Sequence, residues 1–184
     1  VAVTKDGLYA VAAVNTSPDF GNATGFLTII DMLSREIVGT INVGGQPDSV
    51  KVSPDNKYIA VAVENERDED LGDGAPPQLP AGFLFVIDKS NCSLEDWTFE
   101  TVELAGGDFK FPTDPEPEFV DINSNNQLVL TLQGNNALVL VDLDSVFLPV
   151  TTVVIVFDAG MVNLTMMDAT EDSVVSQVES LDMI

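Results

Sequence analysis

One phrase occurs three times along this chain: a polar turn, an apolar strand, a polar connection, and a second apolar strand that ends in aspartate. The copies cover residues 4–31, 53–88 and 123–142, and they close on Asp31, Asp88 and Asp142. The apolar runs are short, rich in Val, Ile, Leu and Phe, and bounded by Gly, Asn, Asp and Pro, which is typical of β-strands. A repeated supersecondary unit of this kind constrains the class of fold before any single residue does.

The spacing of the repeat predicts an all-β fold, a β-propeller of four-stranded blades. Further strand-like runs precede each polar turn and follow each closing aspartate, so each unit holds about four strands. The closing aspartates are 57 and 54 residues apart, which exceeds the ~40–50 residues of a typical blade and indicates inserted loops. We expect about three to four blades of a larger ring, because propellers need ~4–8 blades to close. An open solenoid is the structural alternative.

We expect the blades to occupy residues 1–157, because the repeat breaks down over residues 158–184. This tail predicts an irregular or partly helical continuation inserted between strands, with a helix beginning near Asp168 or Thr170. The apolar run 146–157 contains Pro149 and is too short to cross a bilayer, so it predicts one or two core strands. No direct membrane insertion is expected from this segment.

The charge is extreme: 30 acidic residues stand against 7 basic ones, with no histidine and a net charge of -23. Such a polyanion repels nucleic acid and anionic lipid, and it attracts cations or basic partners. Solubility in a salty or extracellular medium is the simpler interpretation of the same charge. The absence of histidine excludes Ser-His-Asp and Cys-His catalysis and imidazole metal sites within these residues.

Four N-x-Ser/Thr sequons indicate a glycosylated, secreted protein. Their asparagines are Asn15, Asn22, Asn91 and Asn163. The single cysteine, Cys92, cannot form a disulfide within these residues, so it is free or pairs with a partner outside them. Acidic residues downstream of Cys92 disfavour an activated thiol, which makes a structural cysteine the better interpretation.

The densest acidic run lies in residues 64–74, an insertion between two predicted core strands. Its oxygen ligands suit a hard cation such as Ca²⁺. However, Asp68, Asp70 and Asp73 miss the 1-3-5 carboxylate spacing of a calcium loop. We therefore interpret this run as a solvated acidic loop.

A proline-acid pair is a better site candidate, because it recurs before the inner strand of successive units. Asp48 follows Pro47, and Glu118 follows Pro117, at equivalent places in the repeat. That place lies at the expected central mouth of the propeller, where carboxylates would hold Ca²⁺. The predicted metal ligands are Asp48, Glu64, Glu66, Glu116 and Glu118. The alternative is that these acids accept backbone hydrogen bonds from neighbouring turns.

These residues also carry a family resemblance. The run VGGQPDSVKVSPDNKYIAVAVENE at 43–66, followed by EPEFV at 116–120 and TLQGNNA at 131–137, resembles the characteristic phrases of choice-of-anchor I propellers. This family includes mesenchyme-specific cell-surface glycoproteins. The resemblance implies an extracellular or surface-attached propeller, with seven blades, associated with biomineral deposition in animals and fused to hydrolase domains in some microbes.

The expected function is therefore an extracellular or cell-surface binding or structural component that binds Ca²⁺. Expected partners are other surface or matrix proteins, or the remaining blades of the same protein, and not nucleic acid. The alternative is a metal-dependent hydrolase, phosphoesterase or lactonase-like, with the same carboxylates holding a catalytic metal in the central channel.

Overall fold

The computed structural model describes residues 1–184 except 92, 149–153, 163–180 and 183–184. Three four-stranded antiparallel sheets, here called blades 1 to 3, follow one another along the chain. Blade 1 contains β1 (Ala2–Val3), β2 (Tyr9–Asn15), β3 (Gly25–Asp31) and β4 (Ile37–Asn42). Blade 2 contains β5 (Pro47–Val52), β6 (Tyr58–Val63), β7 (Phe83–Asp88) and β8 (Thr98–Glu103). Blade 3 contains β9 (Pro117–Ile122), β10 (Gln127–Leu132), β11 (Ala137–Asp142) and β12 (Val154–Asp158).

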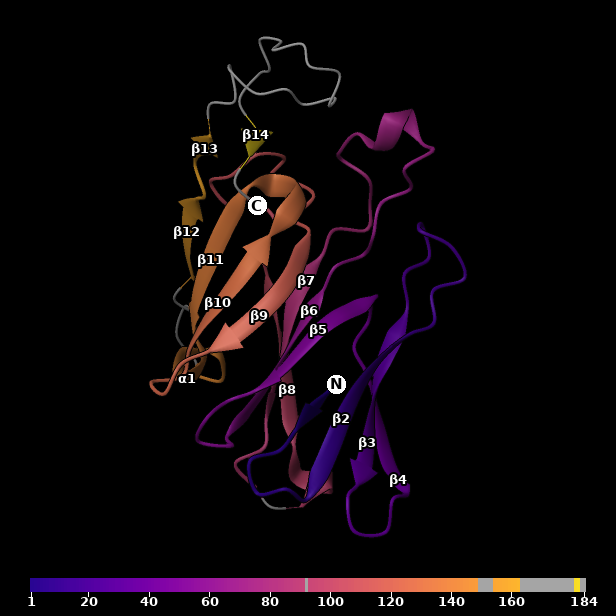
Figure 1. Cartoon of the computed structure of the whole chain (residues 1–184), viewed down its shortest axis with the longest axis vertical. Helices are drawn as coiled ribbons and strands as arrows, with labels where there is room; N and C mark the ends of the chain where they lie inside the picture. Colours follow the sequence, from indigo (N-terminus) through magenta and orange to yellow (C-terminus); the bar gives the residue numbers. More distant parts are fainter. Residues whose placement is uncertain (92, 149–153, 163–180, 183–184) are drawn as a thin grey trace, which may run out of the picture.

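The blades stand side by side as an open arc (Figure 1). Each is a meander in which strands adjacent in sequence are hydrogen-bonded, and the first strand is the edge strand that contacts the neighbouring blade, here called the inner strand. The inner strands β5 and β9 lie next to each other, and β1 contacts β5. This architecture confirms the all-β fold with four-stranded, propeller-like blades. The short helical elements are η1 (Gly72–Gly74), η2 (Leu94–Asp96), η3 (Gln133–Asn135) and α1 (Leu143–Val146).

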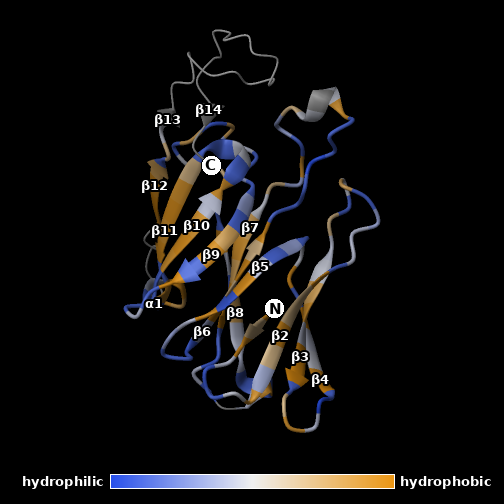
Figure 2. Cartoon of the chain, in the orientation of Figure 1, coloured by the Kyte–Doolittle hydropathy of each residue, from blue (hydrophilic) through white to orange (hydrophobic). Residues whose placement is uncertain are grey.

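Alternation along the strands sends one set of side chains to each neighbouring blade, because successive residues of a strand point to opposite faces. In β6, Ile59 and Val61 pack in the core shared with blade 1, whereas Ala60 and Ala62 pack in the core shared with blade 3. All four side chains are fully buried. Figure 2 shows that hydrophobic residues are concentrated in the strands and hydrophilic residues in the connections. Blade 2 is therefore hydrophobic on both faces.

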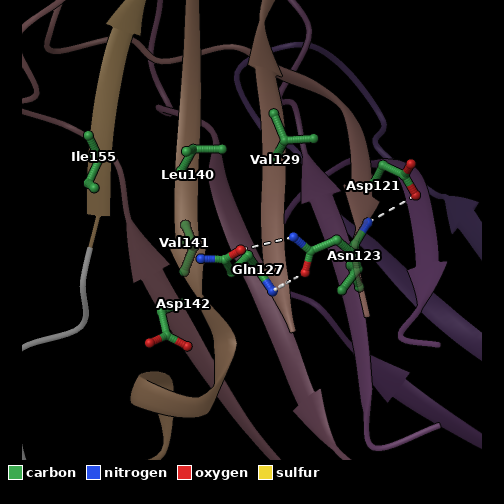
Figure 3. Close-up of a pocket in the computed structure, with 9 residues that line it drawn as sticks. Asp121, Asn123, Gln127, Val129, Leu140, Val141, Asp142 and Ile155 are labelled. Atoms are coloured by element: carbon green, nitrogen blue, oxygen red, sulfur yellow. Dashed lines mark hydrogen bonds between the residues drawn. The ribbon is translucent and has the colours of Figure 1, made fainter. Parts of the chain in front are cut away.

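Blade 3 presents an apolar face on its far side. The paired residues Val129 and Leu140 occupy the positions that the paired residues Ala60 and Val86 have in blade 2. Ala60 and Val86 of blade 2 are covered by blade 3. By contrast, Val129 and Leu140 are not covered by another blade of the described structure, and together with Ile155 they line a groove of about 280 Å³ (Figure 3). The arc is thus open at blade 3 within the described part of the chain.

The described residues after α1 complete blade 3 and then form a small separate sheet. The apolar run contributes one strand, β12, which pairs with β11. It was expected to form core strands, but Val154, Ile155 and Phe157 are exposed, because β12 is the outer edge strand of blade 3. A short two-stranded sheet then joins β13 (Met161–Val162) to β14 (Leu181–Asp182). The helix predicted near Asp168 lies outside the described residues. No helix in the described residues is long and apolar enough to cross a membrane.

Candidate metal centre

Two matching bulges place the proline-acid pairs at the same end of the arc, called the mouth end because β2 and β6 finish there. Pro47 pairs with Val63, and Pro117 pairs with Leu132, and each inner strand then slips by one residue. A bulge bends its strand and re-aims the neighbouring side chain. Asp48 and Glu118 follow these two prolines and so occupy equivalent positions on β5 and β9.

Buried asparagines fix the backbone before each proline. Asn65 Oδ1 accepts a hydrogen bond from Gln46 N at 2.8 Å, and Asn135 Oδ1 accepts one from Glu116 N at 2.8 Å. Both asparagines are almost completely buried. Because Asn65 adopts a left-handed conformation with φ 56°, the chain turns sharply immediately after Glu64. A hydrogen bond to a buried asparagine side chain therefore fixes the backbone at the start of both β5 and β9.

Three carboxylates from the two blades converge at the mouth. Asp48, Glu64 and Glu118 each offer one oxygen, and these oxygens all lie within 4.8 Å of one another. Within the described part of the chain, none of the three forms an ion pair with lysine or arginine. Three carboxylates supply up to six oxygen ligands, and hard cations such as Ca²⁺ are bound by 6–8 oxygens. Placing like charges together without compensation is costly unless a cation or protons neutralise them.

The pKa values of the three groups respond to this crowding. Burial raises the pKa of Glu64 to about 7, and the nearby charges of Asp48 and Glu118 add to the effect. Burial likewise raises the pKa of Asp48, with a contribution from Glu66, and that of Glu118, with a contribution from Asp48. The cluster consequently favours binding a positive charge.

Glu116 was also predicted as a ligand, but the structure gives it a different partner. Arg67 Nη1 lies 2.7 Å from Glu116 Oε2, and Arg67 Nε lies 3.0 Å from Asp114 Oδ2. The carboxylate of Asp114 is almost completely buried. Gly134 packs against this ion pair, and a Cβ at that position would overlap both Glu116 and Arg67. Glu116 therefore belongs to a buried triad that anchors the acidic loop to blade 3.

Glu66 lies beside the cluster rather than within it. Its Oε2 accepts a hydrogen bond from Gln46 Nε2 at 3.1 Å, and its charge raises the pKa of Asp48. Of the five predicted ligands, the structure brings three together, leaves Glu66 adjacent and pairs Glu116 with Arg67.

Sequence reasoning missed Gln133, which takes in blade 3 the place of Glu64 in blade 2. Glu64 N donates to Gln46 O at 2.9 Å, and Gln133 N donates to Glu116 O at 3.1 Å. With its amide nitrogen turned toward Glu118, Gln133 lies 3.1 and 3.2 Å from the two carboxylate oxygens. An amide oxygen is also a calcium ligand. The sequence offered one signal for this equivalence: Gln133 immediately follows the second strand of its blade, as Glu64 does.

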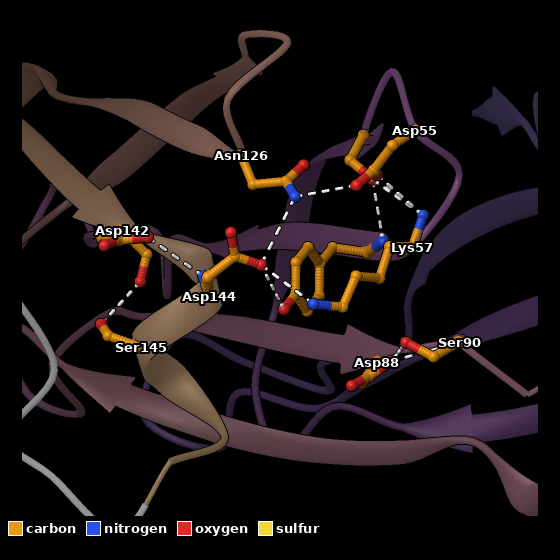
Figure 4. A network of polar contacts seen from close by, with 10 residues as sticks. Asp55, Lys57, Asp88, Ser90, Asn126, Asp142, Asp144 and Ser145 are labelled. Atoms are coloured by element: carbon orange, nitrogen blue, oxygen red, sulfur yellow. Dashed lines mark hydrogen bonds and ion pairs between the residues drawn. The ribbon is translucent and has the colours of Figure 1, made fainter.

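At the opposite end, here called the turn end, the carboxylates are compensated. The left-handed residues Asn56 and Asn126 each donate to the aspartate of the preceding turn, at 2.7 Å to Asp6 and 2.8 Å to Asp55. These bonds link blade 1 to blade 2 and blade 2 to blade 3. Asp144 accepts from Lys57 Nζ at 2.9 Å and from the Tyr58 hydroxyl at 2.9 Å (Figure 4).

The pKa values at the turn end shift the other way. Burial would raise the pKa of Asp6, but hydrogen bonds from Thr4, Leu8 and Asn56 outweigh burial and hold it at about 2. The hydrogen bond from Lys57 lowers the pKa of Asp144. These turn-end carboxylates are structural hydrogen-bond acceptors.

Three of the four sequon asparagines lie on the surface of the described structure. Asn15, Asn22 and Asn91 are exposed, and Asn163 lies outside the described residues. Asn22 Nδ2 donates to both oxygens of Asp19 at 2.9 and 3.0 Å. Cys92 is likewise outside the described residues, so the prediction that it is free or pairs with an external partner is not tested.

Stacked four-stranded blades with a carboxylate cluster at one end of the inner strands define a β-propeller with an acidic mouth. More particularly, the chain belongs to the choice-of-anchor I domain family, whose model matches residues 1–182. Comparison with curated proteins finds no significant match. Among solved structures, hydrazine synthase of Kuenenia stuttgartiensis is similar, with a TM-score of 0.59 and 17% identity. The match covers 79% of this chain but 40% of that one, and it supports the fold alone.

Proposed function

We propose that this propeller is a binding component of a cell-surface or extracellular assembly, and that its mouth binds Ca²⁺ through Asp48, Glu64 and Glu118. The observation that carries the proposal is the convergence of three carboxylate oxygens within 4.8 Å, contributed by two blades. Because β5 and β9 belong to different blades, a bound cation would also tie the blades together. The choice-of-anchor family name and the acidity support a surface location.

Calcium titration of the full chain tests this proposal, with heat measured by calorimetry and stability measured by thermal unfolding. Ligand binding to the folded state alone stabilises it by about 2.7 kcal/mol at 100 times Kd, so the Tm should rise with Ca²⁺. Glu118→Gln should remove most of this rise, whereas Glu103→Gln, an exposed position on β8, should leave it intact. Absence of heat and of any Tm change with Ca²⁺ would reject the cation site.

Glycosylation is a separate part of the proposal and rests on the exposure of Asn15, Asn22 and Asn91. Expression through a secretory pathway followed by glycosidase treatment should lower the apparent mass, and mass spectrometry should locate the sugars. An unmodified secreted protein would argue against the glycoprotein role while leaving the cation site untouched.

The alternative function is a metal-dependent hydrolase, and the half-buried position of Glu64 among the mouth carboxylates is the feature that favours it. A glutamate with a pKa near neutrality suits general base catalysis. A phosphatase and lactonase screen with divalent metals, repeated on Glu118→Gln, distinguishes catalysis from binding. Turnover that depends on Glu118 would replace the binding role with the enzymatic one.

A further inference from the structure

A second surface lies beside the mouth, between the connection 16–24 of blade 1 and the connection 64–82 of blade 2. Both connections extend beyond the sheets at the upper right of Figure 1. They enclose a cleft of about 470 Å³, here called the loop cleft. Its lining includes three acids and three large apolar side chains: Asp19, Glu66, Asp68, Phe20, Leu71 and Leu79. None of its lining residues is basic.

The apolar residues of the loop cleft are unusually open to solvent. Phe20, Leu71 and Leu79 are 42%, 61% and 70% exposed. Single exposed apolar residues are ordinary, but several gathered in one hollow with a polar rim mark an interaction site. The three carboxylates around them provide that rim.

One wall of the loop cleft is held in place before any partner arrives. Gln78 clamps its own loop: Nε2 donates to Asp68 O at 3.0 Å and to Leu71 O at 3.2 Å, and Oε1 accepts from Asp68 N at 2.9 Å. Gln78 N also donates to the buried Asp114 Oδ2 at 2.8 Å. A preorganised wall lowers the entropic cost of binding.

The charge of the loop cleft selects among possible occupants. Arg67 belongs to the same loop, but its guanidinium points to Asp114 and Glu116 and does not neutralise the cleft. A net charge of -23 disfavours a second copy of this chain and an anionic lipid surface. Complementarity therefore favours a positively charged occupant with apolar side chains.

We propose that the loop cleft binds a polypeptide segment in which lysine or arginine side chains stand beside aliphatic ones. The aliphatic side chains contact Phe20, Leu71 and Leu79, and the basic side chains pair with Asp19, Glu66 and Asp68. The proposal does not depend on calcium at the mouth, because the loop cleft is built from other carboxylates. It assigns the partner by chemistry: a cationic, apolar protein segment.

The test uses the full chain and a fluorescein-labelled octapeptide that alternates leucine and lysine, with fluorescence polarisation read in a calcium chelator. Two control peptides replace leucine by serine, which keeps the charge, or lysine by glutamate, which keeps the apolar residues. At ~150 mM salt, where surface attraction is screened beyond ~8 Å, the leucine-lysine peptide should bind at least about tenfold tighter than the serine-lysine peptide. The leucine-glutamate peptide should not bind.

Matched variants locate the binding. Leu71→Ser should remove the preference for the leucine-lysine peptide, and Leu79→Ser provides an independent second variant. Leu33→Ser, at a 94% exposed position on the turn-end hairpin, is the control and should keep it. Equal binding of the serine-lysine and leucine-lysine peptides would overturn the proposal, because acidity alone would then explain the binding. An equal loss in Leu33→Ser would overturn it as well. Calcium titration of Leu71→Ser separates this result from the cation site, which that variant leaves intact.

Discussion

The two ends of the propeller use the same side-chain chemistry to opposite effect. At the turn end, Asp6 and Asp144 accept hydrogen bonds or pair with lysine, and their pKa values are lowered. At the mouth end, Asp48, Glu64 and Glu118 face one another, and their pKa values are raised. With 7 basic residues for 30 acidic ones, few carboxylates can pair with a base, so hydrogen-bond donors and bases together separate the structural carboxylates from those at the mouth.

Arg67 draws this distinction within the mouth itself. Glu116 and Glu118 are two residues apart, yet Glu116 is paired with Arg67 whereas Glu118 faces Asp48 and Glu64. The number of carboxylates in a segment thus does not distinguish a structural acid from one that can bind a cation. The position of the nearest basic side chain distinguishes them better.

Removing Arg67 should therefore produce the largest effect. Arg67→Met leaves Asp114 and Glu116 without their cation, and breaking a buried ion pair from one side costs about 3–5 kcal/mol. The free energy of unfolding, measured by urea denaturation, should fall by this amount. The acidic loop should also open, because Arg67 and Gln78 both bind Asp114.

Lys5→Met is the matched control, since it removes one positive charge from an exposed side chain. Exposed substitutions usually change stability by less than about 0.5 kcal/mol. A loss for Arg67→Met no larger than for Lys5→Met would show that the triad is not structural, and the contrast between Glu116 and Glu118 would fail.

The fold was predictable because it follows from a pattern written three times. The two-residue period of a strand follows from the local backbone alone, and the packed blades retain it: Ile59 and Val61 face one neighbouring blade, and Ala60 and Ala62 face the other. The equivalence of Asp48 and Glu118 was predictable for the same reason, because both follow a proline in the repeat.

The ion partners were not predictable, because they depend on contacts between residues distant in sequence. Arg67 meets Asp114 from a loop 47 residues away. That loop resembled a solvated acidic run, yet Gln78 and Arg67 fasten it to blade 3. Gln133 became visible as the counterpart of Glu64 only when the hydrogen bonds to Gln46 and Glu116 were compared.

A smaller effect is expected at the mouth, where Glu64 binds its proton more tightly in the folded protein than in the unfolded chain. Its pKa rises from 4.5 to about 7. Between these pH values the folded state carries more protons, so the free energy of unfolding should decrease as pH rises from 4.5 to 7. Glu64→Gln removes this dependence. Above pH 7, Glu64→Gln should therefore be more stable than the parent protein. Because Glu64 is only half-buried, solvent screening limits this difference in the free energy of unfolding to on the order of 1 kcal/mol.

Urea denaturation of both proteins at a series of pH values, in a calcium chelator, measures this difference. Below pH 4.5 the two curves should converge, because Glu64 is then protonated in both states. Glu103→Gln serves as the control for removing one acid elsewhere. If Glu64→Gln is less stable than the parent protein at pH 7, the mouth carboxylates are not in electrostatic conflict.

The smallest effect is expected at the turn end, although the contacts there are short. Asp144→Asn removes the ion pair with Lys57 but retains an oxygen that accepts from the Tyr58 hydroxyl. The side chains of Lys57 and Asp144 are 39% and 52% exposed, and exposed pairs contribute about 0.2–1 kcal/mol. A double-mutant cycle with Lys57→Met should give a coupling energy in this range, which decreases in high salt. A coupling above about 2 kcal/mol that is insensitive to salt would mean that the pair is desolvated. The two ends would then differ in the sign of their carboxylate interactions but not in their strength.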